Sequence, residues 1–347
     1  MKTFDEVFED RTKYGTKIKT DEYHENGTHP IIDQGQAQIA GYTDLEEGLF
    51  EDVPAIIFGD HTRVIKYIDE PFFLGADGVK VLKSKLSNAN YKYLYYALRN
   101  AKIPNTGYNR HFKWLKEVQI AYPTADEQED IVCVLDKIEG VIEARRKELS
   151  ALDDLIKARF VELFGDPISN PKGWKMVELG ELTQIGSSKR IFEKEYVSEG
   201  IPFYRTKEIV ELSKGNSIST ELFITKERFA EIKEQYGAPQ ASDLFISAVG
   251  TIGVIWIVDG INDFYFKDGN LIRVDGSDKF DSVYMKTLLE NLIAEYKKQM
   301  SSGTAYAALT ISGLTKMKVY DVPMELQNQF ATFVNQVDKS KFINEVA

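Results

Sequence analysis

The chain has 347 residues, of which 43% are apolar, and its formal net charge at pH 7 is -11. This length and composition suit about two domains of ~150 residues with buried cores, so a disordered peptide is excluded. No apolar run approaches the ~18 residues that a membrane-spanning helix needs, and the sequence starting at Met1 turns charged at once, without a signal-peptide core. We therefore expect a cytoplasmic protein with no membrane partner.

The cysteine and the histidines of the sequence predict neither a disulfide nor a metal site. Cys133 is the only cysteine, so it can form neither an internal disulfide nor a CxxC zinc site. The four histidines show no HExxH or other metal-ligand spacing. We expect no metal in this chain.

Positive charge is concentrated in the first part of the chain. Short β-branched and aromatic segments there predict strands, and Tyr91–Arg99 is predicted to be a helix. From Gly78 to Lys116 there are nine lysines and arginines, interleaved with aromatic residues, and no acidic residue. Such a run supplies cations for phosphates and planar or polar side chains for base edges, although a solvated surface over a core of aromatics is the simpler alternative. A weaker acid-free stretch lies at Tyr296–Val319.

A long helix is predicted from Asp126 to Phe164. Apolar residues recur in it at alternating spacings of four and three, which is the pattern of a coiled-coil seam. At ~1.5 Å per residue it would be about 58 Å long, so we expect a spacer that needs a partner helix. The final helix is one candidate, although it is the shorter of the two. The predicted packing positions are Ile131, Leu135, Ile138, Ile142, Leu149, Leu152, Ile156 and Leu163 in the long helix and Phe330, Val334 and Val337 in the final one.

The two halves of the chain are similar. Residues 55–69 align with residues 245–259 at a constant offset of 190, and three further blocks follow in the same order, ending in a proline and a helix in each half. Chance matching of generic strands is the alternative. The predicted fold class is α/β (α+β), with two similar mixed α/β modules at 1–125 and 166–322. A spacer helix at 126–165 separates them, and a short helix at 323–347 closes the chain.

Four sequence motifs resemble the specificity subunit of type I restriction-modification enzymes. They are PTADEQ at 123–128, RFVELFGDP at 159–167, GW at 173–174 and PMELQNQ at 323–329. The resemblance covers essentially the whole chain. It implies that each module is a target recognition domain reading one half of a bipartite DNA sequence, and that the helices hold the modules apart and dock methyltransferase subunits.

The resemblance also implies where the chemistry lies. Adenine methylation with S-adenosylmethionine and ATP-driven cleavage with magnesium would belong to the methyltransferase and restriction subunits, so this chain should hold no cofactor and no catalytic residue. Consistently, the sequence has neither GxGxxG nor a GxxxxGK[ST] nucleotide motif. The main alternative function is a protein-protein adaptor without a DNA role. A stand-alone nuclease or methyltransferase is a weaker alternative.

If the chain binds double-stranded DNA, two kinds of residue are predicted to touch it. Phosphate contacts would come from lysines, and base readout from the polar loops at 105–111 and 302–306, with Arg110 suited to guanine and Asn109 to adenine. The predicted DNA-binding residues are Lys80, Lys83, Lys85, Tyr108, Asn109, Arg110, His111, Lys113 and Lys116 in the first module and Lys297, Lys298, Thr304, Tyr306, Lys316 and Lys318 in the second.

Overall fold

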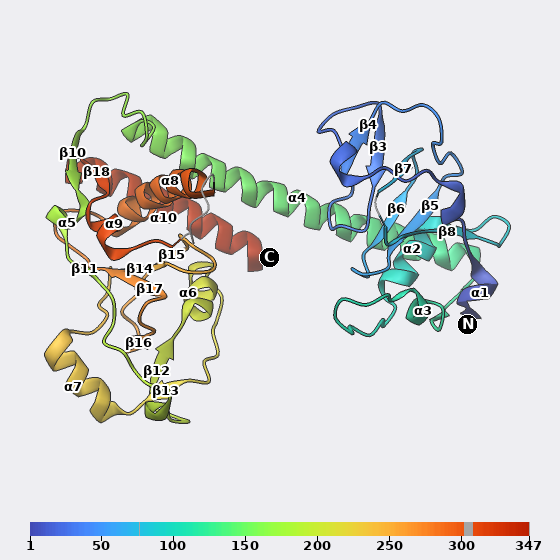
Figure 1. Cartoon of the computed structure of the whole chain (residues 1–347). Helices are drawn as coiled ribbons and strands as arrows, with labels where there is room; N and C mark the ends of the chain where they lie inside the picture. The colour runs from blue at the N-terminus through green and yellow to red at the C-terminus, as the bar shows by residue number, and fades with distance from the viewer. Residues whose placement is uncertain (76, 302–307, 347) are drawn as a thin grey trace. The chain divides into compact units, whose positions relative to one another are not determined.

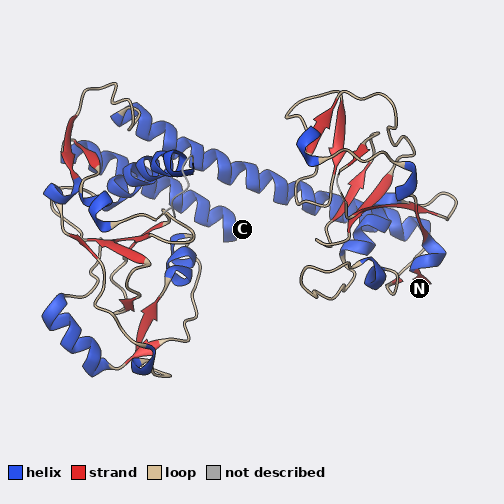
Figure 2. Ribbon diagram, viewed as in Figure 1, coloured by secondary structure: helices blue, strands red, loops and turns tan. Residues whose placement is uncertain are grey.

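The computed structural model describes residues 1–75, 77–301 and 308–346. The chain divides into two compact units, Met1–Ala144 and Arg145–Ala347. The boundary falls inside the long helix α4 (Ala125–Phe164), whose 40 residues confirm the predicted long helix. Figure 1 labels the elements, and Figure 2 shows that each unit mixes helices with strands.

The first unit is built on two small sheets. The larger is antiparallel with the order β2-β8-β5-β6, and the smaller has the order β4-β3-β7, in which β3 and β7 are parallel. β1 and β9 form a separate pair. The strands are β1 (Lys2–Thr3), β2 (Phe8–Asp10), β3 (His29–Ile32), β4 (Gly41–Thr43), β5 (Ala55–Gly59), β6 (Ile65–Ile68), β7 (Phe73–Leu74), β8 (Val79–Ser84) and β9 (Gln119–Ile120).

Short helices complete this unit. β5 is buried along its whole length because residues on both faces of the strand meet core side chains. The side chain of Asn90 caps the helix that covers one face by accepting a hydrogen bond from the Tyr93 N–H, at 3.0 Å. The helices are α1 (Phe4–Val7), α2 (Tyr91–Arg99) and α3 (Phe112–Leu115), with 3-10 turns at Thr12–Tyr14 and Thr20–Glu22.

The second unit repeats this plan, which confirms the predicted similarity of the two halves. Its sheets have the orders β11-β17-β14-β15 and β13-β12-β16, again with one parallel pair in the smaller sheet, and β10 pairs with β18 as β1 does with β9. The strands are β10 (Lys175–Glu178), β11 (Ile185–Gly186), β12 (Ile201–Tyr204), β13 (Phe223–Ile224), β14 (Leu244–Ser247), β15 (Ile255–Ile257), β16 (Tyr265–Phe266), β17 (Leu271–Val274) and β18 (Lys318–Asp321).

Two helices of the second unit, α6 and α7, follow β12 and β13 respectively, and the described residues of the first unit contain no helix at the corresponding places. α8 and α9 occupy the places that α2 and α3 have in the first unit, and α10 follows β18 as α4 follows β9. The helices are α5 (Leu179–Leu182), α6 (Thr206–Ser213), α7 (Lys226–Tyr236), α8 (Ser282–Ser301), α9 (Ile311–Thr315) and α10 (Met324–Val346), with a 3-10 turn at Glu193–Glu195.

Within the first unit, polar contacts attach α4 to α2. The Tyr96 hydroxyl lies 2.6 Å from an Asp136 carboxylate oxygen and 2.9 Å from one of Glu139, while Lys92 pairs with Asp136 at 3.2 Å. The hydrogen bond from Tyr96 holds the pKa of Asp136 below its usual range. Arg99 pairs with Glu139 one turn further along α4.

The predicted packing positions on the long helices differ sharply in exposure. Phe330, Val334 and Val337 of α10 are buried. Leu135, Leu149, Leu152, Ile156 and Leu163 of α4 are half-buried, whereas Ile131, Ile138 and Ile142 are 38%, 48% and 45% exposed. In the first unit, α4 therefore presents apolar side chains to solvent.

Candidate nucleic-acid interface

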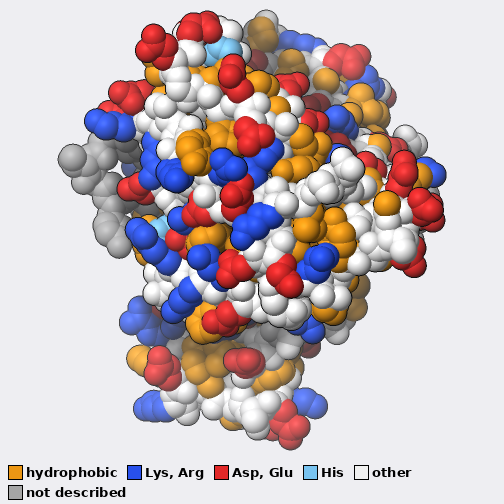
Figure 3. Space-filling view, turned by 90° about the vertical axis from the view of Figure 1, so that its right-hand side faces the viewer, with side chains coloured by type: hydrophobic (Ala, Val, Ile, Leu, Met, Phe, Trp, Pro, Cys, Tyr) orange, Lys and Arg blue, Asp and Glu red, His pale blue; other side chains and the backbone are white. Residues whose placement is uncertain are grey.

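The acid-free run Gly78–Lys116 is not a free polycation, because more distant segments supply acidic partners for much of it. Lys80 pairs with Asp10 at 3.0 Å, and Lys92 and Arg99 pair with Asp136 and Glu139 of α4. Figure 3 shows the result: on the face that it presents, lysine and arginine side chains are interspersed with aspartates and glutamates.

Two of the predicted DNA-binding residues lie inside the first unit. Lys83 is only 8% exposed, and its ammonium group donates to the carbonyl oxygens of Asp52 and Pro54 and pairs with the Asp52 carboxylate at 2.7 Å. His111 is fully buried. As a correction, we remove both from the proposed DNA contacts, because a buried and hydrogen-bonded side chain cannot reach a phosphate or a base edge without unfolding its surroundings.

His111 instead anchors the loop that precedes α3. Its Nδ1 lies 3.0 Å from the Asp60 carbonyl oxygen and its Nε2 lies 3.3 Å from the Thr106 hydroxyl. The Asp60 carboxylate accepts the Phe112 N–H at 2.7 Å. The bonds to Asp60 tie His111 and Phe112 to the turn between β5 and β6, and the contact with Thr106 holds the start of the same segment against His111.

Other loops join the same turn. The side chain of Gln34 accepts a hydrogen bond from the His61 N–H at 3.1 Å and donates one to the Asp77 carbonyl oxygen at 2.9 Å. Arg63 donates to the Ile103 carbonyl oxygen at 3.3 Å. Four loops, around residues 34, 61, 77 and 107, thus form one cluster, which we call the loop cluster.

Tyr108 and its neighbours are the exposed part of the loop cluster. The ring of Tyr108, which is 88% exposed, stacks on the ring of His61 with centroids 4.8 Å apart. Asn109 and Arg110 are exposed beside it. His61 is not among the residues that the sequence predicts to bind DNA. The signal for it is the polar turn between two apolar strands, because polar turn residues carry binding functions more often than strand residues do.

Exposed cations lie next to the loop cluster. Lys113 lies over the ring of Trp114 at 4.8 Å and Lys116 over that of Phe112 at 5.2 Å, and both are exposed. Lys17, which pairs with Asp77 at 2.7 Å, and more weakly the charge of Arg110 hold the pKa of Asp77 below its usual range. Lys85 is exposed but its ammonium group donates to the Asp5 carbonyl oxygen. Among these residues, Lys113 and Lys116 are the lysines best placed for a phosphate backbone, and Arg110 is exposed close to them in sequence.

In the second unit, most of the lysines predicted to bind DNA already have partners within the protein. Lys297 donates to the Ile252 carbonyl oxygen at 3.1 Å, Lys318 pairs with Glu178 at 3.3 Å and Lys298 with Glu295 at 3.3 Å. Lys316 is exposed at the end of α9. Thr304 and Tyr306 lie outside the described residues. Among the described residues that follow, the Leu309 N–H donates to the Ala248 carbonyl oxygen at 3.2 Å, which connects Leu309 to the turn after β14.

Neither a metal cluster nor a membrane span accompanies these surfaces in the described part of the chain. The described residues contain no group of three or more His, Cys, Asp or Glu side chains that could hold a metal ion. Within the same residues, no helix is both long and apolar enough to cross a membrane.

Comparison with known proteins gives one consistent result. The family profile of the type I restriction modification DNA specificity domain matches residues 1–152 and 171–346. A putative type I restriction enzyme specificity subunit of Haemophilus influenzae is 27% identical over 266 residues, which are 74% of this chain and 66% of that protein. A type I restriction enzyme specificity subunit of Escherichia coli is 27% identical over 239 residues, which are 63% of this chain and 56% of that protein. The chain thus spans less than two thirds of the length of these relatives.

The fold is likewise similar to a solved structure. The crystal structure of the type I restriction-modification S subunit from M. genitalium superposes with a TM-score of 0.58 at 18% identity, over 99% of this chain and 90% of that one. At this identity the likeness establishes the fold alone.

Proposed function

Because the chain belongs to the type I restriction-modification DNA specificity family, we propose that it is the DNA-binding specificity subunit of such a complex, each unit reading one half of a bipartite target. The observation that carries this proposal is the duplication, because the family match covers both units and each repeats the same sheets. Two similar readers in one chain suit a target with two separate halves.

In the first unit, the loop cluster would meet the DNA. Lys113 and Lys116 are placed to contact phosphates, which position a protein on the duplex without specifying sequence. Tyr108, Asn109 and Arg110 are the exposed groups suited to base edges, with Tyr108 stacked on the half-buried His61, since arginine pairs with guanine and asparagine with adenine in the major groove. In the second unit, the loop at 302–306, which lies outside the described residues, would take this part.

Arg110→Ala is expected to weaken binding of one half-site by about 1–3 kcal/mol and to relax the base preference there, because a bidentate contact to a base edge is lost. Binding measured on an oligonucleotide library checks this. Preference at the other half-site should stay unchanged in the same variant, which serves as an internal control. A uniform loss over all sequences would instead assign Arg110 to a phosphate.

The long helix α4 is proposed to set the spacing between the two half-sites. Inserting four residues near Glu148 lengthens a helix by ~6 Å, and DNA rises ~3.4 Å per base pair, so the preferred spacer should change by about one or two base pairs. Both half-sites should remain as they were. Methylation mapping of cells carrying the insertion checks this, and an unchanged spacer would count against the helix as a ruler.

Catalysis is proposed to lie in other chains. Methyltransferase subunits docked on the helices would supply S-adenosylmethionine and the adenine-methylating groups, and restriction subunits would supply ATP- and magnesium-dependent cleavage. This chain would then be non-catalytic by itself. Incubating the purified chain with DNA, magnesium and S-adenosylmethionine tests this directly, and either methylation or cleavage would overturn it.

Comparing the methylomes of cells with and without this chain is the decisive test of the whole proposal. A specificity subunit predicts loss of methylation at one bipartite motif only. An adaptor without a DNA role predicts no motif-specific loss. The two functions also differ in how DNA affinity depends on salt. Phosphate contacts give a slope of log affinity against log salt of about -0.9 for each phosphate neutralised, and an adaptor would show no such slope.

A further inference from the structure

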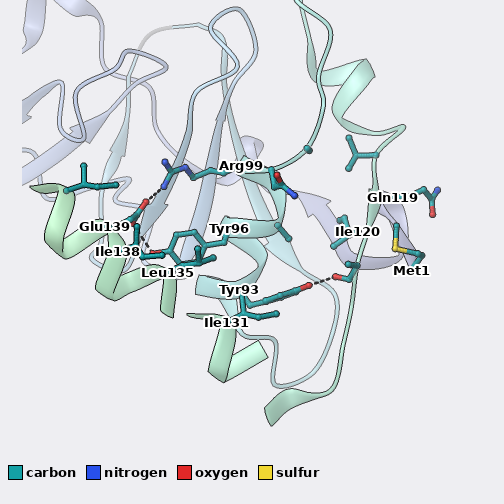
Figure 4. Close-up of a pocket in the computed structure, with 16 residues that line it drawn as sticks. Met1, Tyr93, Tyr96, Arg99, Gln119, Ile120, Ile131, Leu135, Ile138 and Glu139 are labelled. Atoms are coloured by element: carbon teal, nitrogen blue, oxygen red, sulfur yellow. Dashed lines mark hydrogen bonds and ion pairs between the residues drawn. The ribbon is translucent and has the colours of Figure 1, made fainter. Parts of the chain in front are cut away.

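An apolar groove of about 720 Å³ lies between α4 and α2 in the first unit. In Figure 4, Ile131, Leu135 and Ile138 of α4 lie on one side of it, facing Tyr93 and Tyr96 of α2. Ile142 extends the same row of side chains. Exposed aliphatic side chains lining a groove of this size on a helix are typical of a surface that another helix covers.

The second unit contains the equivalent site, and two pairs of hydrogen bonds establish the correspondence. The hydroxyl of Tyr93 donates to the Ala121 carbonyl oxygen at 2.7 Å, and that of Tyr284 to the Tyr320 carbonyl oxygen at 3.5 Å. At the start of the next helix in each unit, a buried glutamine side chain donates to the carbonyl oxygen five residues earlier. Gln128 donates to Pro123 at 2.9 Å, and Gln327 donates to Val322 at 2.9 Å.

This correspondence pairs the groove positions one by one. Counting from the two glutamines, Ile131 corresponds to Phe330, Leu135 to Val334 and Ile138 to Val337. The exposures differ: Ile131 and Ile138 are 38% and 48% exposed, whereas Phe330 and Val337 are 0% and 7% exposed. The same surface is therefore covered in the second unit and open in the first.

The last turns of α4 cover the site in the second unit. Phe160 and Phe164, four residues apart, pack on Tyr284 with ring centroids at 6.0 and 4.7 Å, and on Phe330 at 5.5 and 5.7 Å. Both phenylalanines are buried. Since side chains at i and i+4 lie on one face of a helix, the pair forms a single aromatic ridge that fills the site.

We propose that the groove of the first unit binds a helix of a partner polypeptide that presents two aromatic side chains four residues apart, as Phe160 and Phe164 are presented in the second unit. The duplication supports this occupant, because Tyr93 stands where Tyr284 stands and the aliphatic row stands where Phe330, Val334 and Val337 stand. The proposal does not depend on DNA reading.

One difference between the two sites favours a different polypeptide over a second copy of this chain. In the second unit, Lys341 of α10 pairs with Asp153 of α4 at 2.7 Å, seven residues before Phe160. The position equivalent to Lys341 in the first unit is Ile142. A second copy would place the Asp153 carboxylate against this isoleucine without a cation, which costs desolvation energy. The partner helix should carry an apolar residue seven positions before its first aromatic one.

Binding of two labelled peptides to the full chain tests the proposal. Both cover Arg146–Phe164 and are held helical by a side-chain staple, and one carries Asp153→Leu. Fluorescence anisotropy should show the Asp153→Leu peptide binding about tenfold more tightly, because its leucine meets Ile142. In the chain variant Ile142→Lys the preference should reverse, since the lysine restores the ion pair with Asp153. A peptide with Phe160→Ala and Phe164→Ala should bind neither protein.

Two further variants assign the binding to the groove. Ile138→Asp, inside the groove, should abolish peptide binding, whereas Val141→Asp is the matched control on α4, because Val141 is 61% exposed and does not line the groove. If the Asp153→Leu peptide shows no binding at ~1 mM, its binding free energy is weaker than about 4 kcal/mol, and the proposal is overturned. So would an unchanged affinity in Ile138→Asp.

Self-association provides the remaining outcome. If sedimentation shows a dimer of the wild-type chain that Ile142→Lys strengthens, a second copy occupies the groove and the assignment to a different polypeptide is overturned. DNA affinity measured on the same Ile138→Asp protein keeps this test separate from the proposed function, because the loop cluster and its lysines are not altered.

Discussion

Phe330→Ala is expected to lower the free energy of unfolding of the second unit by about 3–5 kcal/mol, because the substitution removes a fully buried ring and leaves a cavity. The ring of Phe330 meets those of Phe160 and Phe164 at nearly right angles, with interplanar angles of 81° and 81°, so their edge-to-face contacts are lost as well. Urea unfolding followed by tryptophan fluorescence measures the change.

Phe192→Ala is the matched control for this prediction, since Phe192 is 56% exposed in the same unit. Its substitution should change the free energy of unfolding by less than about 0.5 kcal/mol. If Phe330→Ala does not fold, Phe330→Leu should give an intermediate loss. Equal effects of Phe330→Ala and Phe192→Ala would show that α10 does not hold the second unit together.

The double variant Lys113→Glu, Lys116→Glu is expected to weaken DNA binding for all sequences alike and to flatten the slope of log affinity against log salt by about 1.8. Both lysines are exposed beside the loop cluster, and phosphate contacts carry no base preference. Filter binding or anisotropy over a series of salt concentrations measures the slope.

Lys13→Glu, Lys137→Glu is the control for this prediction, because it makes the same change in net charge at two exposed lysines outside the loop cluster. If both double variants lose affinity equally, only the net charge matters and Lys113 and Lys116 make no local contact. If neither changes the salt slope, the first unit does not use this surface to bind DNA.

Much of the architecture follows from the sequence alone. The long helix was predicted because a heptad seam is a local periodic signal that persists through the residues of α4. The duplication was predicted because strands, prolines and helix starts recur in the same order, and the sheets of the two units indeed share one connectivity.

Only the tertiary structure decided which cations are free. The run Gly78–Lys116 contains no acidic residue, yet Lys80 and Lys92 find partners 70 and 44 residues away, and Lys83 is buried against carbonyl oxygens. Likewise, His111 is a buried anchor and His61 is part of the loop cluster, because four distant loops meet at one turn. Local charge and hydrophobic periodicity are properties of the sequence itself, but the burial and ion pairing of a side chain depend on which distant segments folding brings together.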